Sequence, residues 1–256
     1  MHKGLLRTFF VGSLFVCFAL SADAQATRTW VSGVGDDVNP CSRTAPCKTF
    51  AGAISKTAAN GEINCLDPAG YGAVTITKAV TIDCSGTLGG ILGAGTNGII
   101  INISSDTSDF AKTVRIRGIS LNGAATGING IKILAASKVF VENSVIDGFT
   151  GSGILAENTG STQLTVSRSV IRNNGSGISA APKESAEVFV SESLIAGNGV
   201  GLQASGNSTI RIAGSTVGRN ATGLSAVNKG AIISFGNNAI GGNITDGSPT
   251  STTALK

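Results

Sequence analysis

The chain has 256 residues, of which 36 are glycine, 13% are charged and 5% are aromatic. So few large side chains argue against an ordinary compact core of this size and favour a thin stack of small aliphatic residues. The formal net charge of +4 is too small and too scattered to indicate nucleic-acid binding.

The first residues have the pattern of a secretory signal peptide. Lys3 and Arg7 precede an apolar run of about 12 residues, and positions 22–24 read Ala-Asp-Ala, with small residues where a signal peptidase cleaves. The apolar run is shorter than the roughly 20 residues that a membrane-spanning helix needs. We therefore expect residues 1–24 to be removed before Gln25, and the mature chain to be secreted, periplasmic or on the cell surface, without a membrane span.

Cleavage would remove His2, the only histidine, together with Cys17. A mature chain without histidine has no Ser-His-Asp or Cys-His centre and no zinc site with histidine ligands. Four cysteines remain, an even number in an exported chain, and this predicts two disulfides.

The spacing of these four cysteines suggests how they pair. Cys41 and Cys47 enclose a short loop that contains proline, and Cys65 and Cys84 lie 19 residues apart, close to one period of the repeat described below. The alternative is a zinc site with four cysteine ligands, but the spacing differs from that of paired Cys-x-x-Cys knuckles. We therefore predict the disulfides Cys41–Cys47 and Cys65–Cys84, and no metal site.

The N-terminal part of the mature chain reads as a cap over residues 25–61. Residues 28–47 predict a short strand and a turn-rich loop tied by the first disulfide. Residues 48–60 predict a helix, because apolar residues recur at helical spacing from Phe50 to Ala58 and Asn60-Gly61 ends the pattern. Such a helix can cover the open apolar end of a repeat array, and Trp30 is expected to pack beneath it.

From residue 62 onward the sequence repeats with a period of 22–25 residues and about three short strands in each period. Four columns keep this step: Ile116, Val141, Val166, Val190, Ile212 and Phe235; Leu121, Ile146, Ile171, Ile195, Val217 and Ile240; Gly130, Gly153, Gly177, Gly201 and Gly223; Asn174, Asn198, Asn220 and Asn243. The apolar columns predict an interior stack, and the asparagine column predicts an amide ladder at a corner. The fold class is therefore all-β, a parallel β-helix over residues 62–245, followed by a loose C-terminal tail over residues 246–256.

Several segments carry a resemblance to known proteins. They are TWVSG at 29–33, DVNP at 37–40, PCKTFAGA at 46–53, GEI at 61–63 and GYGAVTITKAVTI at 70–82. In these residues the chain resembles the right-handed parallel β-helix repeat proteins of the pectate-lyase-like superfamily, in particular the small secreted bacterial members. The resemblance implies a right-handed β-helix over residues 28–245. It does not choose among lyases, hydrolases, epimerases and adhesins, because all of these share the fold.

Lyases of this superfamily place acidic calcium ligands and a basic residue along one exposed strand face, where the base removes the proton next to a uronate carboxylate. The nearest arrangement here is a group of charges on three successive rungs: Glu142 and Asp147, then Arg168 and Arg172, then Glu192. The register places Asp147 beside Arg172, and Arg168 between Asn143 and Glu192.

These five residues have two interpretations. The catalytic one makes Arg168 or Arg172 the base or carboxylate clamp, with Asp147, Glu142 and Glu192 as its ligands or binding partners. The structural one is a ladder of ion pairs between rungs, each contributing about 0–1 kcal/mol. We favour the ladder, because opposite charges one period apart are what such a ladder requires.

The sequence therefore predicts a secreted, non-catalytic scaffold that binds polysaccharide or another cell-surface partner and needs no cofactor. The alternative is a calcium-dependent polysaccharide lyase acting on an acidic, uronate polymer, with a groove between Arg168 and Arg172 and the longer turn at 104–112. A glycoside hydrolase is disfavoured, because nothing in the sequence fixes the separation of the acidic residues of that turn, Asp106 and Asp109.

Overall fold

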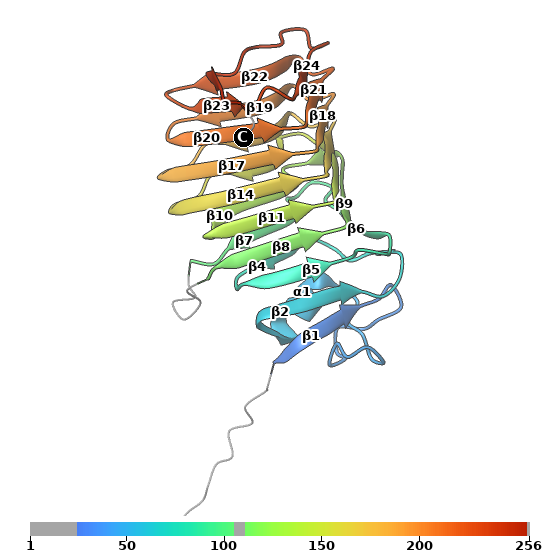
Figure 1. The fold of residues 1–256 in the computed structure, drawn as a ribbon. Helices are drawn as coiled ribbons and strands as arrows, with labels where there is room; N and C mark the ends of the chain where they lie inside the picture. The colour runs from blue at the N-terminus through green and yellow to red at the C-terminus, as the bar shows by residue number, and fades with distance from the viewer. Residues whose placement is uncertain (1–24, 105–110, 255–256) are drawn as a thin grey trace, which may run out of the picture.

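The computed structural model describes residues 25–104 and 111–254, so the predicted signal peptide lies outside the described residues. The chain winds into a solenoid whose strands form three parallel sheets of ten, eight and seven strands within the described ranges (Figure 1). Each full turn of the solenoid contributes one strand to each sheet. The predicted all-β parallel β-helix is confirmed.

We name the three sheets A, B and C in the order in which a turn visits them. Sheet A contains β1 (Ala26–Val31), β2 (Thr57–Cys65), β5 (Val80–Asp83), β8 (Thr113–Arg117), β11 (Lys138–Glu142), β14 (Ser161–Ser167), β17 (Ser185–Ser191), β20 (Ser208–Ala213), β23 (Ala231–Ser234) and β25 (Ser251–Thr252). Sheet B contains β3 (Ala69–Gly70), β6 (Gly89–Leu92), β9 (Ile119–Gly127), β12 (Val145–Phe149), β15 (Val170–Arg172), β18 (Leu194–Ala196), β21 (Thr216–Gly218) and β24 (Ala239–Ile240). Sheet C contains β4 (Val74–Ile76), β7 (Ile99–Asn102), β10 (Ile131–Ala135), β13 (Ser152–Ala156), β16 (Ser176–Ala180), β19 (Val200–Ser205) and β22 (Thr222–Val227).

The predicted apolar columns form the interior of the solenoid. Ile116, Val141, Val166, Val190 and Ile212 pair in register across sheet A, and each is fully buried. Their neighbours along each strand point outward, because side chains alternate between the two faces of a strand.

The predicted position of Phe235 in this interior column is wrong. Ser234, not Phe235, pairs with Ile212. The extra residue of this period falls in the turn that follows β23, where the Ser234 hydroxyl accepts hydrogen bonds from Gly236 and Asn238. Phe235 instead packs edge-on against the ring of Phe189, at 6.1 Å between ring centroids.

The glycine column is required where successive turns lie closest together. An ideal Cβ on Gly177 would lie 2.5 Å from the carbonyl oxygen of Gly201 in the next turn, which no real carbon and oxygen tolerate. The same contact with the next turn recurs at Gly153 and Gly201, at 2.8 and 2.6 Å. Glycine therefore lets the turns stack at the spacing that their hydrogen bonds need.

Replacing Gly177 by alanine should destabilise the protein by about 2 kcal/mol, since the new methyl group must push two backbone segments apart. The free energy of unfolding in urea measures this effect. Gly160→Ala is the matched control, because a Cβ there meets nothing within 4 Å. Equal stability of the two variants would contradict this account of the column.

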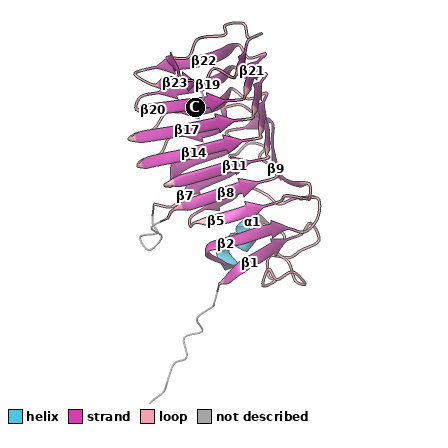
Figure 2. Cartoon of the chain, viewed as in Figure 1, coloured by secondary structure: helices cyan, strands magenta, loops and turns pink. Residues whose placement is uncertain are grey.

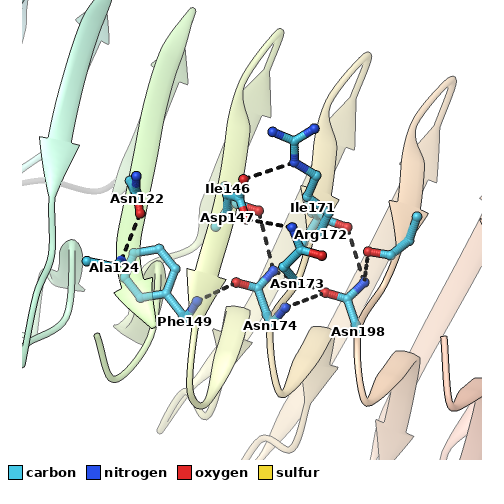
Figure 3. A network of polar contacts seen from close by, with 11 residues as sticks. Asn122, Ala124, Ile146, Asp147, Phe149, Ile171, Arg172, Asn173, Asn174 and Asn198 are labelled. Carbon is cyan, nitrogen blue, oxygen red and sulfur yellow. Dashed lines mark hydrogen bonds and ion pairs between the residues drawn. The ribbon is translucent and has the colours of Figure 1, made fainter. Parts of the chain in front are cut away.

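The asparagine column forms the predicted amide ladder (Figure 3). The Oδ1 atom of Asn198 accepts the backbone N–H of Asn174 at 3.0 Å, and the Oδ1 atom of Asn220 accepts that of Asn198 at 2.9 Å. The side-chain amide of Asn198 also donates to the carbonyl of Ile171 at 3.2 Å. Each buried asparagine thereby satisfies backbone groups of its own turn and of the neighbouring turns at the corner where sheet B turns into sheet C.

Asn198→Ala should lower the free energy of unfolding by about 3 kcal/mol, because it leaves a buried N–H and a buried carbonyl without partners. Chemical denaturation measures the loss. Asn207→Ala, at an exposed asparagine, serves as the control and should change stability little. A loss of the same size at both positions would show that the ladder does not carry the effect.

A second ladder, formed by serines, lies at the corner between sheets A and B. The sequence analysis did not predict it. The hydroxyls of Ser169, Ser193 and Ser215 each accept the backbone N–H of the serine one turn earlier, at 3.1–3.2 Å. Each hydroxyl donates to a carbonyl two residues before it, as Ser193 does to Ser191. This corner is therefore closed by side chains as well as by backbone.

The helix is shorter than predicted and replaces a strand. Helix α1 spans Phe50–Lys56, and Thr57 already begins β2, where it pairs with Ala26 of β1 (Figure 2). Pairing with β1 keeps the segment from residue 57 onward extended, so the predicted boundary at residue 61 falls inside β2. Phe50 donates its N–H to the carbonyl of Tyr71 just before β4, which puts α1 in the place that a strand of sheet C takes in later turns.

Both predicted disulfides are confirmed. Cys65 ends β2 and Cys84 directly follows β5, the next strand of sheet A, so this bond joins two successive turns. Cys41 and Cys47 close the loop between β1 and α1. The covalent links are thus concentrated at the N-terminal end, where the solenoid departs from its regular repeat.

The predicted loose C-terminal tail is corrected by the structure. Thr245 bridges to Thr222 of β22, and β25 pairs with β23 in sheet A. Residues 246–252 therefore add a last partial turn. The backbone groups on the last strand of a sheet would otherwise have no hydrogen-bond partners. The very short strand β25 provides partners for β23 and leaves only a short unpaired edge of its own.

Candidate functional site

The structure brings together four of the five predicted site residues in two ion pairs. The Arg172 Nε atom lies 3.0 Å from Asp147 Oδ2, and Asn173 donates to the other oxygen of the same carboxylate (Figure 3). Arg168 donates to Asn143 at 3.1 Å and lies 4.0 Å from Glu192. These are the neighbours that the register predicted.

Glu142 does not join these two pairs. It lies on the outward face of sheet A and accepts from Arg117 Nε at 2.7 Å, and Arg117 also lies 3.8 Å from Asp83. The hydrogen bond to Glu142 raises the pKa of the Arg117 guanidinium above its ordinary value. The sequence analysis missed Arg117, although it stands 25 residues before Glu142, one full period, and the repeat itself was the signal.

The backbone holds Arg168 and Glu192 outward at a corner. Both residues adopt the left-handed conformation, with φ of 46° and 50°, in the turn from sheet A to sheet B. The longer turn joins the solenoid elsewhere, because Ser104 follows β7 of sheet C and Lys112 precedes β8 of sheet A. The two described ends of that turn therefore lie at a different corner from Arg168 and Arg172. Asp106 and Asp109 lie outside the described residues.

Within residues 25–104 and 111–254, no group of three or more histidine, cysteine, aspartate or glutamate side chains is placed to hold a metal ion. The charges in question instead form pairs between neighbouring turns. Their side chains are about a quarter to two thirds exposed. Pairs with such access to water contribute little to the stability of the fold.

The outward face of sheet A carries aromatic rings as well as charges. Arg115, Phe140, Thr165, Phe189 and Arg211 stand in one column across five successive strands, β8 to β20. The guanidinium of Arg115 lies over the Phe140 ring, 5.0 Å from its centroid. Arg211 lies 3.4 Å from Glu187, beside a shallow hollow of about 280 Å³ that Phe189 also lines. We call this column, with Glu187 and Phe235 beside it, face A.

Trp30 does not pack beneath the helix as expected. It lies on the outward side of β1, opposite Asn64 of β2, and is only partly buried. The buried neighbours of Trp30 in β1 are Thr29 and Val31, whose side chains point the other way. Trp30 lines a separate hollow at the N-terminal end of sheet A.

The fold and this surface can now be compared with known proteins. The family model described as "Right handed beta helix region" matches residues 64–240, which is more than half of the chain. The chain belongs to the right-handed β-helix family. This β-helix protein is also similar to a solved structure titled "Crystal structure of pectate lyase Pel9A". The TM-score is 0.57 at 16% sequence identity, over 83% of this chain and 72% of the other.

These findings confirm the resemblance to pectate-lyase-like β-helix proteins and its implied handedness. Among curated proteins, none matches the sequence of this β-helix protein. At 16% identity the pectate lyase shows a shared fold, and the fold hosts many chemistries.

A double-mutant cycle on Arg172→Ala and Asp147→Ala distinguishes a surface ladder from a tightly held catalytic pair. We expect a coupling energy of about 0.5 kcal/mol in the free energy of unfolding, as for other exposed pairs. The cycle of Arg172→Ala with Glu157→Ala is the control and should show no coupling, because Glu157 pairs with Lys132 on sheet C. A coupling of several kcal/mol would contradict the ladder.

Proposed function

We propose that this protein is a secreted, non-catalytic scaffold that binds polysaccharide along face A. The observation that carries the proposal is the column Arg115–Phe140–Thr165–Phe189–Arg211, in which rings and cations recur at the spacing of the strands. Neighbouring strands are about 4.8 Å apart, so the two rings lie about 10 Å apart along the solenoid axis. On such a surface, a polymer with a regular repeat would contact side chains that are spaced at equal distances.

The chemistry of the column suits a sugar chain. One face of a sugar ring presents C–H groups, which aromatic rings remove from water. Arginine and glutamate side chains beside the rings offer several donors and acceptors to hydroxyl or carboxylate groups. Phe189 is 37% exposed, so its ring is accessible to a ligand while its base is held by the sheet.

Secretion is part of the proposal. The N-terminal sequence has the pattern of a cleaved signal, and two disulfides are typical of proteins that fold in an oxidising compartment. The described part of the chain contains no helix that is long and apolar enough to cross a membrane.

Phe189→Ala should weaken binding to the preferred polysaccharide about tenfold, which corresponds to about 1.4 kcal/mol, because it removes an accessible ring from the centre of face A. Leu194→Ala is the matched control: Leu194 is 40% exposed but lies on sheet B. An array of polysaccharides identifies the ligand, and titration of the two variants against it measures the effect. Equal losses in both variants, or no binding to any polymer, would overturn the proposal.

The same samples test for lyase activity. A lyase acting on a uronate polymer with calcium produces an unsaturated product that absorbs ultraviolet light. We expect no increase in absorbance. An increase that is lost in Arg168→Ala or Arg172→Ala would establish the catalytic interpretation in place of the scaffold.

A further inference from the structure

The outward side chains of sheet B stand in two columns across six successive strands, β6 to β21. The first column is Gly90, Ser120, Val145, Val170, Leu194 and Thr216, and the second is Leu92, Asn122, Asp147, Arg172, Ala196 and Gly218. We call these two columns face B. They contain one acidic and one basic residue, and the other side chains are small, apolar or uncharged.

Face B exposes apolar surface toward both of its ends. Leu92 is 63% exposed on β6, and Leu194 is 40% exposed on β18. A hollow of about 630 Å³ opens in the N-terminal half of the face, beside the exposed Leu88, and none of the described residues that line it is charged. Exposed apolar side chains that gather on one face in this way mark an interaction surface.

The size of the side chains makes face B complementary to itself. We consider a second copy placed face to face with the first and related to it by a two-fold axis that runs parallel to the strands, between β12 and β15. In this register β12 meets β15, β9 meets β18 and β6 meets β21. Leu194 then lies over Ser120 at the hollow, and Leu92 lies over Gly218. Large side chains therefore meet small ones, while the valines of β12 and β15 meet each other.

The charges of face B select the same register. Asp147 of one copy meets Arg172 of the other, and the two-fold axis repeats this contact. Within one chain the Arg172 Nε atom lies 3.0 Å from Asp147, and the guanidinium has two further nitrogens that can donate to a second carboxylate (Figure 3).

Other registers bring like charges together. A shift of the second copy by one strand opposes two arginines at position 172 or two aspartates at position 147, according to its direction, and like charges in contact disfavour both arrangements. In the selected register the corner residues Arg168 and Glu192 meet Asn143 and Gly118, which carry no charge.

We propose that two copies of this chain associate through face B into a dimer with two-fold symmetry and antiparallel solenoid axes. A two-fold interface must be complementary to itself, and face B meets this requirement in both size and charge. Six strands about 4.8 Å apart make a face roughly 25 Å long, so the buried area is at the lower end for specific interfaces and the dimer is reversible. The inference is independent of polysaccharide binding, because face A lies on a different sheet.

Sedimentation of the full chain, purified as the exported protein, measures the association. We expect a monomer at about 1 μM and mostly dimer at about 200 μM, as for an interface of this size. A monomer at every concentration in this range overturns the inference.

Charge reversal tests the register. Arg172→Asp and Asp147→Arg should each raise the dissociation constant of the dimer at least about tenfold, because each opposes like charges in both symmetric contacts. An equimolar mixture of the two variants should associate again, since one carries two acidic residues where the other carries two basic ones. Thermal unfolding checks that both variants fold. A mixture that associates no better than either variant alone, or two variants that each dimerise like the original chain, overturns the proposed register.

A last pair of variants assigns the interface to face B. Val170→Glu should raise the dissociation constant at least about tenfold, because it places a carboxylate in the apolar centre of the contact. Phe189→Ala on sheet A is the control and should leave the dimer unchanged. The proposed function predicts the reverse order for polysaccharide binding, so the two proposals fail separately. A dimer that Phe189→Ala weakens and Val170→Glu leaves intact overturns the inference.

Discussion

The hydrogen bonds between successive turns are the constraint on which the rest of this structure depends. They hold neighbouring strands about 4.8 Å apart in all three sheets, and this spacing decides which side chains are allowed in each column. Only glycine fits where Gly153, Gly177 and Gly201 approach the next turn. The interior is a narrow stack of mainly aliphatic side chains, which explains why a chain of this length contains so few large residues.

The hydrogen bonds between turns also explain the ladders of side chains at the corners. A corner repeats at every turn with its backbone groups in the same orientation, so one suitable side chain can satisfy them again and again. The asparagine column does this between sheets B and C, and the serine column does it between sheets A and B. Surface charges follow the same logic, since Arg117 and Arg172 each pair with a carboxylate of a neighbouring turn. Regular stacking therefore produces flat faces with paired charges.

Where the chain departs from the regular repeat, its surface differs from the flat faces with paired charges. The first turn replaces a strand of sheet C with α1 and replaces sheet B with a disulfide-closed loop, and the resulting misfit leaves the hollow beside Trp30. The column of Phe140 and Phe189 is a departure of another kind, because aromatic rings replace polar residues on an outward face. Both features lie on sheet A.

The sequence by itself determined the features that a period can express. These are the β-helix, the interior columns, the asparagine ladder, the Cys65–Cys84 disulfide and the pairing of Asp147 with Arg172, because residues about one period apart must be neighbours in such a stack. The tertiary structure alone decided what the period leaves open. Phe235 lies outside the interior column because the turn after β23 is one residue longer than in the preceding period. The segment from Thr57 is a strand because it pairs with β1. The hollow at Trp30 depends on how a loop and a helix end meet in space, and no spacing along the chain encodes that contact.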